Sequence, residues 1–305
     1  MPTSWSVGPV IAYLFTDEPV TLIDAGLASS RPVIEEALNA AGLSPADVAR
    51  ILVTHGHGDH LGGALWLQEA SGCDVCLHPT EIAMVTRAPA DVIRELFGPL
   101  GFAERMLDEY ARRPLRRLPQ LTPIEDGTVA RTGGCRLRVE HHPGHTPGHL
   151  WLSEEDSGAL FAGDYLLASG PTNPGMVTDA AAPSGRAPLL AQYVAGLTEL
   201  ARRAPPVIFA GHGEPITAVR ELVQRRVARI ERRGRRVLAA LRRADEPTAA
   251  ELAEELYRGR ARASFDVIAE LVGHLDLLVS EGHASARLGE DGYWHFRAIE
   301  GGPHA

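Results

Sequence analysis

Four side chains that can bind metal lie within six consecutive residues: His55, His57, Asp59 and His60. In an extended chain, residues two apart point to the same side, so His55 and His57 can face one ion. Asp59 and His60 follow one turn of loop later and can face a second point. Imidazole and carboxylate at such short spacing are typical ligands of zinc-type ions. The stretch therefore predicts a metal site, in preference to a polar loop that happens to be rich in histidine.

The segments around this stretch predict how it is held. Residues 51–53 are apolar and predict a buried strand, and residues 61–67 predict the beginning of a helix. The ligands would then lie on a strand-to-helix loop, a common place for catalytic groups. Gly56 and Gly58 carry no Cβ, so the backbone between the ligands can pass close to an ion.

Three further candidates, His145, Asp164 and His212, lie far along the chain. Asp164 and His212 each follow a short apolar run, and His145 follows the predicted strand 136–140 and a glycine-containing turn. The repeated pattern of strand, glycine and ligand-capable side chain predicts that the three meet at one edge of a sheet. Together they can complete two coordination spheres that residues 55–60 begin.

This set resembles the metallo-β-lactamase-fold hydrolase superfamily. The resemblance rests on the order of these seven residues and covers residues 1–215. It implies an α/β fold, the αββα metallo-β-lactamase sandwich of two mixed sheets faced by helices. It also implies two Zn²⁺ ions, with Fe or Mn as alternatives. The implied ligands are His55, His57 and His145 for one metal, Asp59, His60 and His212 for the other, and Asp164 as the bridge.

Two further residues are expected to support the ligands. Asp24 matches the family's strand end and is expected to orient a ligand. His149 follows the His145 turn and is given the same role. Six other histidines are expected to be core or surface residues: His78, His141, His142, His274, His283 and His295.

The predicted chemistry is hydrolysis. Two cations lower the pKa of a shared water to near neutrality, and the resulting hydroxide attacks an acyl carbon or phosphorus. Asp59 is the predicted catalytic residue, because it can also orient that hydroxide and accept its proton. No Gly-x-Ser-x-Gly elbow is present.

The chain is expected to contain a catalytic domain, 1–215, and a helical winged-helix-like C-terminal domain, 216–305. Helices are predicted at about 216–243, from Thr248 onward by a capping box with Glu251, and at 265–281, followed by a hairpin. This arrangement is similar to a bacterial branch of the superfamily whose relatives include endoribonucleases and glyoxalase II thioesterases. An irregular helical insertion at 80–118 is expected either to cap the substrate pocket or to be a packing excursion.

Charge separates the candidate substrates. The net charge is −9, but residues 1–215 contain 15 Arg and 25 Asp or Glu, whereas residues 216–305 contain 15 Arg and 14 Asp or Glu. An acidic catalytic portion disfavours polyanions at long range. A small thioester or other ester is therefore the leading substrate. Single-stranded RNA is the alternative, because ten Arg between 220 and 243 could follow a phosphate backbone.

The sequence also gives expectations about cellular location and oligomeric state. No apolar run is long enough to cross a bilayer, no N-terminal signal pattern is present, and a cytoplasmic protein is the default expectation. A homodimer through the C-terminal module is left open. Cys73 and Cys76 are expected to pack within a strand, because strand positions three apart face opposite sides.

Overall fold

The computed structural model describes residues 1, 7–102, 117–170, 172–257 and 265–300. Two compact units are present. Unit 1 comprises residues 1–86, 116–172 and 197–222, and unit 2 comprises residues 87–115, 173–196 and 223–305. Residues 103–116 of the predicted insertion and Pro171 lie outside the described residues. These compact units differ from the predicted domains, because residues 87–115 and 173–196 belong to the same unit as the C-terminal residues. The division into two functional domains at 215/216 stays a prediction.

The first sheet of unit 1 has the strand order β1-β2-β3-β4-β5. β1 is antiparallel to β2, and the remaining neighbours are parallel. The strands are β1 Tyr13–Phe15, β2 Thr21–Ile23, β3 Arg50–Leu52, β4 Asp74–Leu77 and β5 Leu121–Pro123.

The second sheet of unit 1 has the order β10-β9-β8-β7-β6, with β9 and β10 parallel and the other pairs antiparallel. Its strands are β6 Val129–Thr132, β7 Cys135–His141, β8 Leu150–Glu154, β9 Leu160–Gly163 and β10 Ile208–Ala210. Both sheets are therefore mixed, as the resemblance implied.

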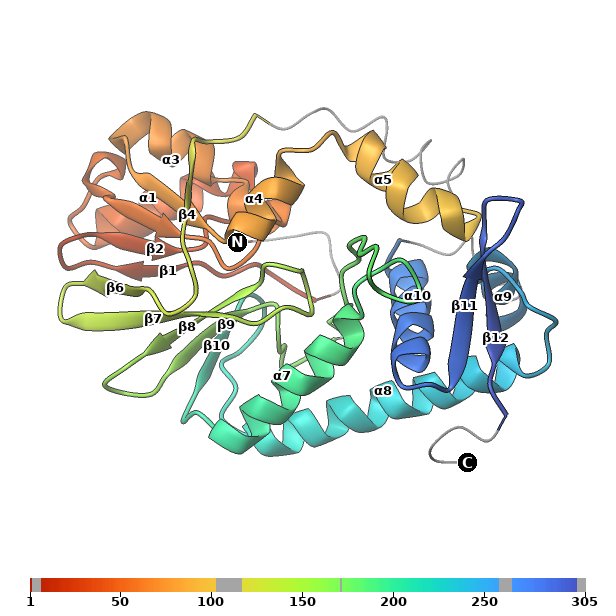
Figure 1. The fold of residues 1–305 in the computed structure, drawn as a ribbon. Helices are drawn as coiled ribbons and strands as arrows, with labels where there is room; N and C mark the ends of the chain where they lie inside the picture. Colours follow the sequence, from red (N-terminus) through yellow and green to blue (C-terminus); the bar gives the residue numbers. More distant parts are fainter. Residues whose placement is uncertain (2–6, 103–116, 171, 258–264, 301–305) are drawn as a thin grey trace. The chain divides into compact units, whose positions relative to one another are not determined.

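The inner faces of the two sheets form one apolar core. Ile23 and Leu52 from the first sheet cluster with Val139, Leu152 and Phe161 from the second. The outer face of the first sheet packs against α1 (Arg31–Ala40) and α3 (Ala64–Ser71), which lie over it in Figure 1. On the second sheet, Arg203 of α7 (Leu189–Arg203) hydrogen bonds to Glu140 of β7. The chain therefore has the αββα sandwich of the metallo-β-lactamase fold.

The segment between β3 and β4 carries the first four ligands and then returns to the sheet. After β3 the chain forms a one-turn helix, α2 (Gly58–Leu61), where a loop was expected, so Asp59 and His60 lie on a helical turn. α3 then ends at Gly72, whose positive φ of 74° is readily adopted by glycine. Cys73 and Cys76 pack into the clusters on opposite faces of the first sheet, as the strand period predicted.

Unit 2 is mostly helical. Its apolar core joins Phe97, Leu241, Leu252, Leu275 and Phe296. The predicted capping box is present, since Thr248 Oγ1 accepts from Glu251 N and Glu251 Oε2 accepts from Thr248 N. The expected order of helices followed by a hairpin is observed, and the winged-helix assignment stays a prediction.

The remaining elements include three short 3₁₀ helices. Among the described residues, no helix is long and apolar enough to cross a membrane. The remaining elements are η1 Ala28–Ser30, η2 Pro45–Asp47, α4 Pro79–Val85, α5 Pro89–Phe97, η3 Gly98–Leu100, α8 Val219–Leu241, α9 Ala249–Leu256, α10 Phe265–Ser280, β11 Ala284–Leu288 and β12 Trp294–Ala298.

Candidate metal centre

Strand ends deliver most of the predicted site residues to one edge of the sandwich. β2 and β3 are parallel, and Asp24 and His55 follow their carboxyl ends. β9 and β10 are also parallel, and Asp164 and His212 follow theirs. Carboxyl ends of parallel strands lie at the same edge, where α/β proteins commonly place their sites. His145 instead lies within the loop between β7 and β8.

The seven predicted ligands form two groups. The first group is defined as His55, His57 and His145, and the second group as Asp59, His60, Asp164 and His212. Within each group, one ligand atom from every residue lies within 4.8 Å of the others. The two groups match the ligand sets that the resemblance implied, except that Asp164 lies with the second group by distance. Its role as a bridge between two metal ions therefore stays a proposal.

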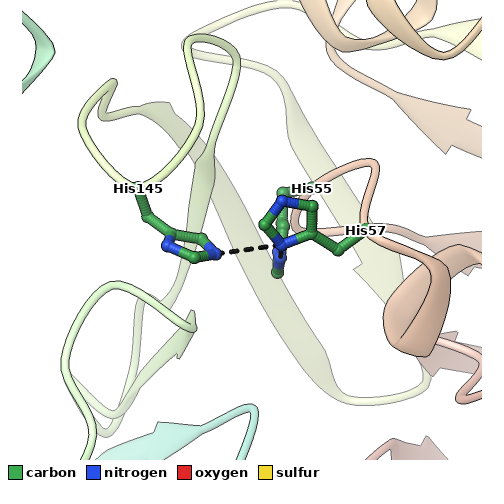
Figure 2. A group of neighbouring side chains, drawn as sticks. All are labelled: His55, His57 and His145. Atoms are coloured by element: carbon green, nitrogen blue, oxygen red, sulfur yellow. Dashed lines mark hydrogen bonds between the residues drawn. The ribbon is translucent and has the colours of Figure 1, made fainter. Parts of the chain in front are cut away.

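Figure 2 shows the three imidazoles of the first group converging from two loops. His57 Nδ1 lies 3.0 Å from His55 Nε2 and 3.1 Å from His145 Nε2. His55 and His145 are buried, whereas His57 is exposed. The first group can therefore be reached from solvent on the side of His57.

Thr54, which sequence reasoning did not select, determines the tautomer of His55. The single Thr54 hydroxyl hydrogen is directed to the Asp24 carboxylate, whose oxygens lie 2.9 and 3.1 Å from Oγ1. Thr54 Oγ1 can then only accept from His55 Nδ1–H, 3.1 Å away. His55 Nε2 is left as a lone pair directed at His57 Nδ1. His57 Nδ1 lies beside two other ring nitrogens and carries at most one hydrogen, so it can donate to only one of them. Three nitrogens arranged in this way are better suited to bind a cation than to hydrogen bond to one another.

The second group combines two carboxylates with two imidazoles. His212 Nε2 lies 3.1 Å from Asp59 Oδ2 and 3.5 Å from Asp164 Oδ2. His60 Nε2 lies 3.4 Å from Asp164 Oδ1, too poorly aligned for a hydrogen bond, so both atoms are buried without a hydrogen-bond partner in the described structure. Buried polar atoms of this kind call for an explanation, and a bound ion supplies one.

Outer partners fix the orientation of both imidazoles in the second group. His60 Nδ1 donates to Asp24 Oδ2 at 2.7 Å, as expected for Asp24. His212 Nδ1 donates to the carbonyls of Gly8 and Pro9 at 3.0 and 3.1 Å. Both Nε2 atoms therefore face Asp59 and Asp164, while the Nδ1–H groups have the carboxylate and carbonyl partners that typically orient metal-binding histidines.

The electrostatics of the two groups differ. Burial lowers the pKa of His55 well below its ordinary value, and the neighbouring His60 adds to this effect, so His55 is neutral and able to bind metal. Burial opposes the charge on His60, but Asp24 and Asp164 outweigh it and raise its pKa well above the usual value. A metal ion in the second group therefore has to displace a proton from His60.

The donor set fits divalent metal ions. The first group offers three imidazole nitrogens, and the second offers two carboxylates and two imidazoles with fixed Nδ1 partners. Zinc, iron and manganese all accept such ligands. The site is thus a divalent-metal site, and the number and identity of the ions belong to the proposal below.

His149 does not act through a hydrogen bond. Its side chain is buried, and neither ring nitrogen has a hydrogen-bond partner among the described residues. Its ring stacks on that of His55, with centroids 5.1 Å apart and an interplanar angle of 24°. Within the described residues, His149 therefore contacts His55 by ring stacking and not by a hydrogen bond.

The cysteines and the other predicted core or surface histidines lie outside both groups. Within the described residues, no group of three or more potential ligands includes a cysteine. Burial raises the pKa of Cys76 to about 11, which keeps that thiol protonated and unreactive at neutral pH. The six histidines expected in the core or on the surface also lie outside both groups.

Comparison with known proteins assigns the class. Residues 5–230 match the family model of the metallo-beta-lactamase superfamily. The chain is 30% identical over 299 residues to the probable metallo-hydrolase YqjP of Bacillus subtilis, covering 92% of this chain and 91% of that protein. The chain therefore belongs to the metallo-β-lactamase superfamily and is a metallo-hydrolase.

More specific relatives include a solved structure and two thioester hydrolases. A metallo-beta-lactamase family protein from Thermus thermophilus has a TM-score of 0.79 at 29% identity, covering 98% of this chain and 97% of that chain. Hydroxyacylglutathione hydrolase from Methylococcus capsulatus is 34% identical over 144 residues, 47% of this chain and 42% of that protein. An atrochrysone carboxyl ACP thioesterase from Aspergillus novofumigatus is 25% identical over 221 residues, 72% of this chain and 52% of that protein.

Proposed function

We propose that this metallo-hydrolase cleaves a small thioester, or a related ester, with two divalent ions held by the two ligand groups. The observation that carries the proposal is the presence of two separate, adjacent ligand groups, each with at least three converging donor atoms. Zinc is the proposed metal, because three imidazoles form a common zinc ligand set. Iron and manganese are the alternatives, because both would suit the carboxylates of the second group.

The chain's own residues divide the work. When bound, the ions would supply an acidified water and electrophilic stabilisation of the developing oxyanion. Asp59 orients the attacking water and accepts its proton. Burial disfavours the charged form of Asp59, but the hydrogen bond from His212 and the charge of His60 outweigh it and hold its pKa below the ordinary value. Asp59 is therefore ionised at neutral pH, as a proton acceptor must be.

The names of the two thioester-hydrolase relatives favour a thioester over other substrates. The acidic balance of residues 1–215 also disfavours a polyanionic substrate. RNA remains the alternative, since eight arginines on α8 or just after its last residue are exposed. These are Arg220, Arg225, Arg229, Arg232, Arg235, Arg236, Arg242 and Arg243.

The proposal is tested with zinc-loaded full-length protein. Acyl-glutathione, acyl-CoA and short labelled single-stranded RNA are incubated with the wild type, with His57→Ala and with the control His283→Ala. Thioester hydrolysis is expected, with a loss on the order of 10³-fold in His57→Ala, because this substitution removes a first-group ligand. His283 lies outside both ligand groups, so its variant is expected to retain wild-type activity.

RNA cleavage that depends on His57, without thioester hydrolysis, would overturn the substrate class but leave the metal centre intact. Metal analysis provides the second criterion. Protein dialysed against zinc is expected to retain two ions per chain, and retention of less than one would contradict the two-ion proposal.

A further inference from the structure

Glu81 lies on α4, outside both ligand groups, yet its carboxylate contacts the loops that carry the first group. The side chain is buried, with 2% of its surface exposed. Its Oε2 accepts from Gly56 N at 2.8 Å, and its Oε1 accepts from Gly148 N at 2.7 Å. Gly56 and Gly148 are 92 residues apart in the sequence, so one side chain joins two distant segments.

The two glycines lie next to the ligands. Gly56 separates His55 from His57, and Gly148 lies three residues after His145 on the same loop. All three ligands of the first group therefore belong to segments attached to Glu81. None of the four residues of the second group is hydrogen bonded to Glu81 among the described contacts.

Both loops approach Glu81 so closely that only glycine fits. A Cβ at Gly56 would lie 2.9 Å from Glu81 Oε2 and 2.4 Å from Val85 Cγ1. A Cβ at Gly148 would lie 2.7 Å from Glu81 Cγ and 2.9 Å from Glu81 N. Two residues without a Cβ atom thus lie against one buried carboxylate, and a larger residue at either position would clash with its surroundings.

The beginning of α4 holds the His145 loop by a second route. The ring of His78, the residue that precedes α4, stacks on His141 with centroids 4.0 Å apart. His141 Nε2 donates to the Pro147 carbonyl at 2.8 Å. The loop is therefore fixed at two consecutive residues, Pro147 and Gly148, from the same end of one helix.

We propose that Glu81 is a positioning residue that sets the separation of the two loops and thereby the metal affinity of the first group. The inference rests on the proposed function in one respect, that the first group binds an ion. Three imidazoles, unlike carboxylates, bring no negative charge to offset the repulsion between their ring nitrogens. Their affinity therefore depends strongly on being held in place beforehand, as is usual for residues that orient metal ligands.

The test compares Glu81→Gln with the matched control Glu69→Gln, whose side chain is 56% exposed on α3. Metal-free full-length protein is titrated with Zn²⁺ and Co²⁺ against a competing chelator. Glu81→Gln is expected to lose about 10- to 100-fold in affinity for one of two ions and to change the Co²⁺ absorption spectrum. The control should be unaffected, and the second ion should be affected less, because Asp59 and His60 also follow Gly56 in the chain but are held by His212 and Asp24.

Amide exchange supplies a readout without metal. Gln has one carbonyl oxygen for two backbone donors, so exchange at Gly56 or Gly148 should accelerate in metal-free Glu81→Gln. If that variant fails to fold, Glu81→Asp is used, whose shorter carboxylate cannot reach both loops, and it should show the same loss at one ion. Unchanged affinity in a folded variant, or equal weakening of both ions, would overturn the proposal. Failure of the wild type to bind metal would instead contradict the proposed function.

Discussion

Charged side chains are buried in both compact units, but their partners differ. In unit 2, Arg186 donates from Nε to Asp276 Oδ2 at 3.0 Å and from Nη2 to Oδ1 at 2.7 Å. Both side chains are at most 4% exposed. Donors face acceptors and opposite charges meet, so this pair is complete without a ligand.

The ligand groups of unit 1 are not complete in this way. In the first group, His55 Nε2 presents a lone pair to another imidazole nitrogen, and in the second, Asp59 and Asp164 approach the same two histidines. Burial of polar atoms therefore does not by itself identify a site. The informative feature is a set of atoms whose donors and acceptors do not match until a cation is added.

Asp59→Asn should produce the largest effect and sharpen this contrast. The substitution preserves shape and an acceptor oxygen for His212 Nε2, but removes the charge that accepts a proton. We expect kcat/KM to fall on the order of 10³-fold, with little change in the urea midpoint of the metal-free protein. Kinetics and urea unfolding measure the two quantities. The exposed carboxylate variant Asp91→Asn is the control, and activity within tenfold of wild type for Asp59→Asn would remove Asp59 from the catalytic role.

Arg186→Met tests the opposite case in unit 2. Breaking one side of a buried ion pair leaves an unpaired charge, and we expect a loss of about 3–5 kcal/mol in the free energy of unfolding. Burial raises the pKa of Asp276 above its ordinary value even though Arg186 opposes this, so the pair does not fully offset its own desolvation. The double variant Arg186→Met/Asp276→Leu should recover most of the loss. Urea unfolding measures both, and metal affinity should stay at the wild-type value.

The ligand groups were largely predictable because their signals are local. Four ligands fall within six residues, and Asp164 and His212 follow recognisable strands. The opposite facing of Cys73 and Cys76 followed from the strand period. These features depend on sequence neighbours and on one general rule about strand ends.

What could not be predicted depends on residues that meet only in the folded chain. Glu81 lies in a segment without a motif, and its two partners are 25 and 67 residues away. Arg186 and Asp276 are 90 residues apart. The helical turn α2 was expected as a loop, since its four residues are too few for a periodic pattern.

His274 should give a smaller and pH-dependent effect. Burial, assisted by the charge of Arg233, lowers its pKa to about 4. The unfolded chain takes up the proton near the ordinary value of about 6.5, so stability is fully present above that pH and is lost as the pH falls toward 4. The largest loss is about 3 kcal/mol. His274→Leu should remove this acid-dependent loss, as measured by urea unfolding between pH 7.5 and 4, and an unchanged pH profile would contradict the assignment.

The smallest effect is expected from an ion pair with the same geometry as Arg186 and Asp276 but a different environment. Arg202 donates from Nε and Nη2 to both Glu199 oxygens, at 2.8 and 2.6 Å, yet its side chain is 74% exposed. In water the Coulomb gain is screened and offset by the entropy of ordering two long side chains. Arg202→Met should therefore leave the urea midpoint unchanged in 0.5 M NaCl. A loss comparable to that of Arg186→Met would mean that paired geometry, and not burial, determines the cost of breaking an ion pair in this protein.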